Sequence, residues 1–307
     1  MVYYLSCWFP HSYQARLTAG FMAASPFAFI IGGPLASFLM SLDGLAGFRG
    51  WQWLFLLEGV PPCLLAFAVL RLLPDTPREA SWLSAEEKDF IARAMALEAH
   101  KTETVSFRAA LADPRVWVLG FCYMAVSAGG YGFRIWLPLI VQGMGFSDFA
   151  TGFVVAVPYV FAMVLMIWWG RSSDTTGERV WHVVLPMLLG AGGFLLAASI
   201  RSDAAVLLGL TAVVIGLDAV IGPFWSLPSA FLRGSAAAAG FALINTFSTG
   251  LGGFLGGYVI GILKEQTGGY EASMLLFAGA LIVSSAVLTV FVRAMLSGRS
   301  EIPASPH

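Results

Sequence analysis

The sequence is poor in charged residues, cysteine and histidine. Asp, Glu, Lys and Arg make up only 11% of its 307 residues, whereas soluble domains carry roughly 25%. The three cysteines, Cys7, Cys63 and Cys122, lie in separate apolar segments without CxxC or Cys/His spacing. We therefore expect them to be apolar fillers rather than disulfide partners or metal ligands. The low charge argues against a water-soluble fold.

Motifs that would indicate an enzyme or a nucleic-acid-binding protein are also missing. The sequence contains no HExxH, no GxSxG and no paired carboxylates within an apolar segment. Its four histidines all lie in or beside expected loops: His11, His100, His182 and His307. A net charge of -1 gives no overall attraction to nucleic acid. We predict neither enzymatic activity, nor a bound cofactor or metal, nor a nucleic-acid partner.

Apolar residues, by contrast, are abundant and fall in blocks of about twenty, the length a helix needs to cross ~30 Å of hydrocarbon. Hydrophobic residues make up 58% of the chain, and the mean hydropathy is +0.79. We predict an all-α polytopic membrane protein with eight complete spans and the end of a further span at residues 1–9. The eight spans are expected near 18–40, 53–73, 116–141, 149–169, 180–200, 204–224, 236–262 and 273–294.

The basic residues predict the orientation in the membrane. If the loop around Arg16 is cytoplasmic, alternation of the spans leaves only Arg49, Arg201 and Lys264 outside, with Arg134 inside a span. This distribution follows the positive-inside tendency. We expect a protein of the cell inner (plasma) membrane, in contact with the lipid bilayer, whose central loop and C-terminus are cytoplasmic.

One long polar stretch divides the chain. The predicted regions are the remainder of an N-terminal helix bundle (1–73), a cytoplasmic central loop (74–115), a six-helix bundle (116–296) and a cytoplasmic tail (297–307). In the central loop, Ser84 and Glu87 have capping-box spacing, which predicts a short amphipathic helix with a structural or a regulatory role. Six spans follow this loop, but only two and the short end of a third precede it. If both halves had six spans, roughly three and a half would be missing before Met1.

Three stretches carry a family resemblance. The first is 4–10 (YLSCWFP) with Arg16 and 32–35 (GGPL); the second is 50–61 (GWQWLFLLEGVP) with 73–77 (LPDTP) and 82–87 (WLSAEE); the third is 170–179 (GRSSDTTGER). Together they resemble the major facilitator superfamily, in particular its anion:cation symporter branch of tartrate, phthalate and sugar-acid carriers. The resemblance covers Val2 to about Arg293. It implies spans 4–12 of a twelve-span carrier truncated at its N-terminus, which we expect to act as a monomer.

The third stretch resembles the superfamily's loop between two spans. It keeps four residues of that pattern: Gly170, Asp174, Gly177 and Arg179. Thr175 and Glu178 stand where the pattern usually has basic residues. The glycines would permit a tight turn, and the Asp and Arg would bridge neighbouring helix ends in one state and release them in another. We expect a gating loop, with a plain solvated turn as the alternative.

Arg134 is the clearest candidate for contact with a substrate. A charged side chain at the centre of a span costs at least ~2.5 kcal/mol and requires a reason. Gly129, Gly130, Gly132 and Pro138 surround it, and we expect them to loosen the helix and free backbone groups toward a cavity. A guanidinium there would form a bidentate pair with a carboxylate, which indicates an organic-anion substrate. Alternatively, Arg134 reaches the outer interface.

Four further polar residues lie within the predicted spans. Asp218 either accepts a coupling proton or neutralises an arginine. Counting residues along the helices places it in the inner half and Arg134 in the outer half, so we do not expect the two to pair. Asn245 either contacts the substrate or makes an interhelical hydrogen bond. Tyr131 and Tyr159 are candidates for hydroxyl contacts with the substrate.

These features predict a secondary carrier that takes up a small organic anion, such as tartrate, a sugar acid or an aromatic carboxylate, by alternating access. The resemblance implies coupling to H⁺ or Na⁺. Two alternatives stay open: a truncated remnant that does not transport, and a carrier that exports drugs or metabolites.

Overall fold

The structure, a computed structural model, describes residues 4, 8, 9, 24–99, 111–229 and 234–297. These residues form helices joined by turns, and none of them lies in a strand. The all-α fold expected from the sequence is therefore confirmed over this part of the chain.

The described residues fall into two compact units. The first takes those up to 99 together with 147–156, and the second takes 111–146 and those from 157 onward. The first contains α3 (Ala24–Met40), α4 (Gly50–Leu72), α5 (Ala85–Ala99), the short 3-10 helices η1 (Leu45–Gly47) and η2 (Pro77–Glu79), and the start of α8 (Asp148–Thr176). The second contains α7 (Pro114–Gly143), the rest of α8, α9 (Val180–Ser199), α10 (Asp203–Ser229), α11 (Gly234–Asn245), the π-helical η3 (Thr246–Leu251), α12 (Gly252–Thr267) and α13 (Glu271–Ser297).

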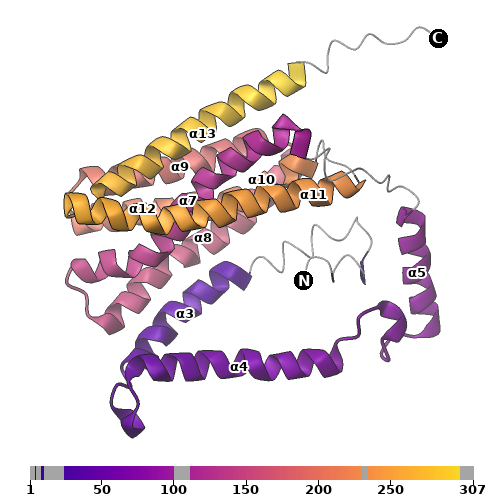
Figure 1. Cartoon of the computed structure of the whole chain (residues 1–307), viewed down its shortest axis with the longest axis horizontal. Coiled ribbons are helices and arrows are strands. Elements are labelled where there is room, and N and C mark those ends of the chain that lie inside the picture. The colour runs from indigo at the N-terminus through magenta and orange to yellow at the C-terminus, as the bar shows by residue number, and fades with distance from the viewer. Residues whose placement is uncertain (1–3, 5–7, 10–23, 100–110, 230–233, 298–307) are drawn as a thin grey trace. The chain divides into compact units, whose positions relative to one another are not determined.

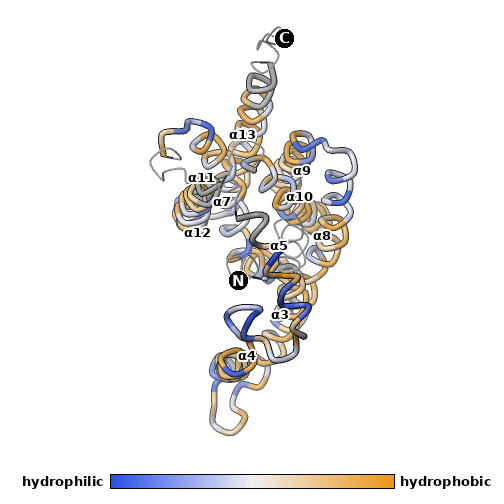
Figure 2. Tube along the Cα trace, turned by 90° about the vertical axis from the view of Figure 1, so that its right-hand side faces the viewer, coloured by the Kyte–Doolittle hydropathy of each residue, from blue (hydrophilic) through white to orange (hydrophobic). Residues whose placement is uncertain are grey.

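Seven helical stretches among the described residues are long and apolar enough to cross a membrane. They correspond to seven of the eight predicted spans, with α11, η3 and α12 forming one continuous crossing. The remaining span, predicted at 18–40, is described only from residue 24 as α3, and most of the predicted stub at 1–9 lies outside the described residues. Figure 2 shows hydrophilic residues gathered at the helix ends and turns, with the helices themselves largely apolar.

The second unit is held together by close helix packing. Its α9 packs against α10 and α13, while α7 packs against α12 and α13, and Figure 1 shows these long helices side by side. Glycines form the tightest crossings: a Cβ on Gly193 would lie 2.5 Å from the Gly209 carbonyl oxygen, and one on Gly132 would lie 2.7 Å from that of Gly256. Small residues of this kind let helix backbones approach in lipid, where apolar surfaces gain little by meeting one another.

The glycines around Arg134 do not loosen their helix, so that expectation was wrong. Helix α7 runs unbroken from Pro114 to Gly143, with Pro138 inside it. Gly132 meets the α12 backbone, and Gly129 faces the ring of Phe194. These glycines are used for helix packing, because the absence of a side chain lets neighbours approach while the α-helical hydrogen bonds remain.

The short helix predicted in the central loop is present as α5. The Ser84 N–H donates to Glu87 Oε2 over 2.9 Å, and the Glu87 N–H donates to Ser84 Oγ over 3.2 Å. This reciprocal pair is the capping box expected from the sequence, and it satisfies two backbone donors at the helix start.

The crossing of α7 and α12 generates a stability prediction. We expect Gly132→Ala to lower the free energy of unfolding by about 1–3 kcal/mol, because the new methyl overpacks a backbone contact. The control is Gly279→Ala on α13, where a Cβ has no atom within 4 Å and the better helix propensity of alanine should leave stability unchanged or slightly raised. Thermal unfolding of the detergent-purified protein compares the two, and equal midpoints would contradict the packing role of Gly132.

Candidate functional site

The second unit places two opposite charges in contact between α7 and α10. Arg134 Nη2 lies 2.6 Å from Asp218 Oδ1, and the two side chains are 23% and 5% exposed. We had expected that Arg134 and Asp218 would not pair and, as an alternative to substrate contact, that Arg134 would reach the outer interface. Both expectations are therefore wrong. The ion pair satisfies two charges that would each be costly alone inside an apolar bundle.

Counting residues along the two spans gave the wrong result because it compared only the depths of the two backbone positions in the membrane. Arg134 lies nine residues before the end of α7, and Asp218 lies fifteen residues after the start of α10. At ~1.5 Å per residue their levels differ by about 9 Å if those two helix ends lie at one membrane surface. The long arginine stem and the usual tilt of membrane helices bridge such an offset.

Two predicted tyrosines complete what we call the Arg134 cluster, which comprises Arg134, Asp218, Tyr131 and Tyr159. The guanidinium carbon of Arg134 lies 5.9 Å from the centre of the Tyr131 ring. The Tyr159 hydroxyl is within hydrogen-bond reach of Arg134, and its side chain is fully buried on α8. Tyr131 is 44% exposed, so the cluster is accessible from the Tyr131 side and closed at Tyr159.

Aromatic residues that the sequence interpretation missed continue the cluster along α7 and α10. The Tyr123 ring stacks on Phe224 with ring centres 4.3 Å apart and meets Trp225 edge-on. The periodic signal was available: Tyr123 precedes Arg134 by eleven residues, and Trp225 follows Asp218 by seven. At ~3.6 residues per turn, both spacings place the pair on one helix face.

The Asp218 carboxylate contacts Arg134 through Oδ1, and its second oxygen lies in a different environment. Its Oδ2 atom is buried and has no hydrogen-bond partner among the described residues. A buried acceptor without a donor costs roughly 1–3 kcal/mol, and more when the group is charged. A proton or a donor group from a ligand would remove that cost.

Asn245 is joined to its own helix rather than to the cluster. Its Oδ1 atom accepts a hydrogen bond of 3.0 Å from Thr249 Oγ1, and its side chain is exposed. This hydrogen bond joins residues of the same helical stretch. The structure therefore shows an intrahelical bond at Asn245 in place of the expected interhelical one. Asn245 is the last residue before the π-helix η3, and π-helical turns occur frequently at functional positions.

The stretch 170–179 is mostly helical. Gly170 and Asp174 belong to α8, which extends to Thr176, and only Gly177 adopts the left-handed turn conformation, with φ of 69°. The expectation that both glycines shape a turn therefore holds for Gly177 alone, because α8 continues past the predicted span. Arg179 Nη1 lies 2.6 Å from Asp174 Oδ1, so the Asp and Arg do bridge the neighbouring ends of α8 and α9.

Glu178, which departs from the family pattern, caps the start of α9. Its carboxylate accepts hydrogen bonds from the backbone N–H groups of Trp181 and His182 over 2.9 and 3.2 Å, and lies 3.1 Å from His182 Nδ1. Burial alone would raise the pKa of the Glu178 carboxyl, but these hydrogen bonds together outweigh burial and hold the pKa below its usual value. An arginine at this position could not accept from those N–H groups.

Comparison with known proteins gives a consistent set of matches. Residues 1–257 match the family model described as Major Facilitator Superfamily. A protein of Agrobacterium vitis named "Putative tartrate transporter" is 43% identical over 309 residues, which cover 100% of this chain and 69% of that protein. A "Quinolone resistance transporter" of Acinetobacter baumannii is 35% identical, over 96% of this chain and 69% of that protein.

A solved structure matches the fold. It is a bacterial homologue of the human lysosomal transporter Spinster, in an inward-facing and occupied conformation, with a TM-score of 0.68. The match covers 95% of this chain and 73% of that one, at 15% identity. At this identity it shows the fold alone.

The Arg134–Asp218 contact generates a prediction about coupled stability. We expect Asp218→Asn alone to cost about 3–5 kcal/mol, because it leaves a largely buried guanidinium without a counter-ion. The double variant Arg134→Gln/Asp218→Asn should recover most of that loss, since no charge remains. A double-mutant cycle of unfolding free energies measures the coupling, and additive effects would contradict a direct pair.

The Glu178 cap generates a pH prediction. Since its folded pKa is lowered, its stabilisation is complete well above the ordinary glutamate value of 4.5 and is lost as the pH falls below that value. At pH 7 we expect Glu178→Ala to cost about 0.5–2 kcal/mol, the usual effect of losing a helix cap. The difference in unfolding midpoint between variant and parent should shrink toward pH 4, whereas the difference between Glu178→Gln and Glu178→Ala, neither of which has a titratable group at this position, should show no such trend. A difference independent of pH would exclude the carboxylate as the cap.

Proposed function

The chain belongs to the Major Facilitator Superfamily, and we propose that it is a secondary carrier that takes up a small organic anion by alternating access. The seven apolar helices found in the described part of the chain, together with this membership, identify a multi-pass membrane protein of a transporter family. The observation that carries the proposal is the Arg134 cluster, in which a guanidinium and a carboxylate meet inside apolar helices.

The chemistry of this cluster favours a carboxylate substrate. A guanidinium presents a planar set of donors that matches a carboxylate, and Arg134 already holds the carboxylate of Asp218. The exposed Tyr131 and the buried Tyr159 offer hydroxyl groups beside it. The relative named as a tartrate transporter supports a hydroxylated dicarboxylate as the first substrate to try.

Exchange of carboxylates would couple transport to protons. One carboxylate of the substrate displaces Asp218 from Arg134, and the released Asp218 takes a proton at its buried oxygen. With a singly charged substrate, such as a dicarboxylate whose second carboxyl group is protonated, the three groups then carry Arg⁺, substrate carboxylate⁻ and a neutral Asp. The cluster is therefore neutral before and after binding. Neutrality matters because each uncompensated charge in the bilayer costs several kcal/mol. We favour H⁺ over Na⁺ because Arg134 repels a metal cation beside Asp218.

The polar turn between α8 and α9 would serve as the gate. In the present conformation the Asp174–Arg179 pair joins the two helix ends, and we propose that it opens in another conformation. The distribution of basic residues supports a cytoplasmic location for this turn, the central loop and the C-terminus, in the inner (plasma) membrane. Asn245, exposed beside the π-helix, is a further proposed substrate contact.

Export of an aromatic drug is a second candidate function. The relative named as a quinolone resistance transporter favours it, and the half-buried Trp225, packed on the rings of Tyr123 and Phe224, would offer an aromatic surface to such a ligand. The two candidates differ in direction, since uptake raises the internal concentration of the substrate and export lowers it.

Labelled tartrate, sugar acids and aromatic carboxylates, offered to cells that express the protein, test the proposal. We expect Arg134→Ala to lower uptake by about tenfold or more, because it removes hydrogen bonds to a charged group. Asp218→Asn should still exchange substrate but should lose accumulation driven by a proton gradient. The control is Arg201→Ala, in the turn between α9 and α10. Uptake that is unchanged in Arg134→Ala would overturn the anion assignment, and a fall in internal drug concentration would favour export.

A further inference from the structure

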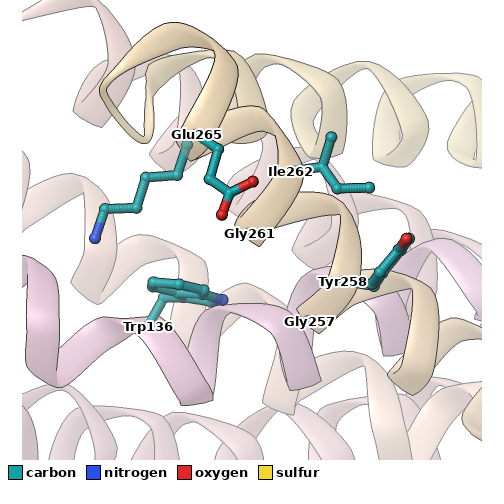
Figure 3. A pocket seen from close by; sticks show the side chains of 7 residues that line it. Trp136, Gly257, Tyr258, Gly261, Ile262 and Glu265 are labelled. Atoms are coloured by element: carbon teal, nitrogen blue, oxygen red, sulfur yellow. The ribbon is translucent and has the colours of Figure 1, made fainter.

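A pocket of about 560 Å³ lies between α7 and α12. Trp136 follows Arg134 by two residues, and ~100° of rotation per residue directs the two side chains to nearly opposite faces. Gly257 and Gly261 supply the α12 wall, where the absence of side chains leaves space. Figure 3 shows Trp136 facing these glycines, with the Glu265 carboxylate beside the same gap.

The lysine of this pocket has no carboxylate partner in the part of the chain that the structure describes. Lys264 Nζ lies 5.0 Å from the centre of the Trp136 ring and 4.7 Å from that of Tyr270, and it donates to the Tyr270 hydroxyl over 2.8 Å. None of the described carboxylates lies within 4.0 Å of this ammonium, although Glu265 is the next residue. Ring faces stabilise a cation, but an ammonium has three donors and hydroxyl contact with Tyr270 uses one.

A second donor is also unsatisfied. Trp136 Nε1 is buried and has no hydrogen-bond partner among the described residues. Tryptophan N–H groups usually find a partner when buried. Beside the acceptor oxygens of Glu265, the wall therefore offers N–H donors of Lys264 and Trp136 that no described residue accepts from, and an acceptor with negative charge matches these donors.

We propose that this pocket binds an anionic oxygen group, either a carboxylate of a soluble acid or the phosphate of a lipid headgroup. Lys264 supplies the charge, and the Trp136 ring forms a flat wall whose N–H reaches the ligand after a small rotation of the ring. Glu265, exposed at the rim, accepts a hydroxyl or ammonium group from the same ligand. This selects hydroxylated acids or polar headgroups over bare anions. The site is separate from Arg134 and does not depend on the proposed transport cycle.

Because the chain has few lysines, ligand binding at Lys264 can be measured directly by chemical labelling. The chain has three lysines, Lys88, Lys101 and Lys264, so amine acylation followed by peptide mass spectrometry reports each one separately. The full protein is labelled in detergent micelles with sodium tartrate or with phosphatidylglycerol. Erythritol and diacylglycerol, which lack the anionic group, are the matched uncharged controls, and sodium chloride keeps ionic strength constant. The half-buried Lys88 on α5 is the internal control.

A ligand at twice its Kd leaves a third of the sites free, so we expect acylation of Lys264 to slow by about threefold while Lys88 is unchanged. Protection by tartrate identifies a soluble carboxylate, and protection by phosphatidylglycerol alone identifies a lipid phosphate. Trp136→Phe, which keeps a ring and removes the N–H, should weaken protection, whereas Arg134→Ala should not alter it. The proposal is overturned if neither ligand protects Lys264, if the uncharged controls protect equally, or if Lys88 slows to the same extent. Loss of protection in Arg134→Ala would place the effect at the other site.

Discussion

The contact between Arg134 and Asp218 is the constraint on which the second unit depends. Each charge on its own would be costly inside an apolar helix, so α7 and α10 must bring the two side chains within reach of each other, both in height and in rotation. The 2.6 Å contact fixes both. It also limits what the site can do, because a group that displaces Asp218 from Arg134 must restore neutrality with its own charge and a proton. The need for charge neutrality thus accounts both for the ion pair and for the proposed coupling of transport to protons.

Glycine packing provides the frame that holds this pair in place. Helices in lipid gain little from burying apolar side chains against each other, so close backbone approach supplies dispersion contacts instead. Gly132 lies two residues before Arg134 and faces the backbone of Gly256. Turning that glycine toward α12 directs Arg134 toward α10 and α8. One short stretch of α7 therefore sets both the packing of one face and the chemistry of the other.

Arg134 on α7 and Lys264 on α12 show that the way a cationic side chain is stabilised depends on its distance from the helix end. Arg134, nine residues inside α7, is paired with a buried carboxylate. Lys264, three residues before the end of α12, is held by two aromatic rings and a hydroxyl. Near a helix end the cation is partly hydrated, and ring faces suffice. At depth it requires an opposite charge.

The sequence by itself determined the membrane class, seven of the spans, the capping box at Ser84, the family and the position of Arg134 within a span, because apolar blocks, cap spacing and isolated charges are local properties. The tertiary structure alone decided that Arg134 meets Asp218 and that Gly132 packs against α12 rather than loosening its own helix. Each of these depends on the level, tilt and rotation of separate helices. A residue count along one helix carries no information about its neighbours, so such contacts could not be derived from spacing.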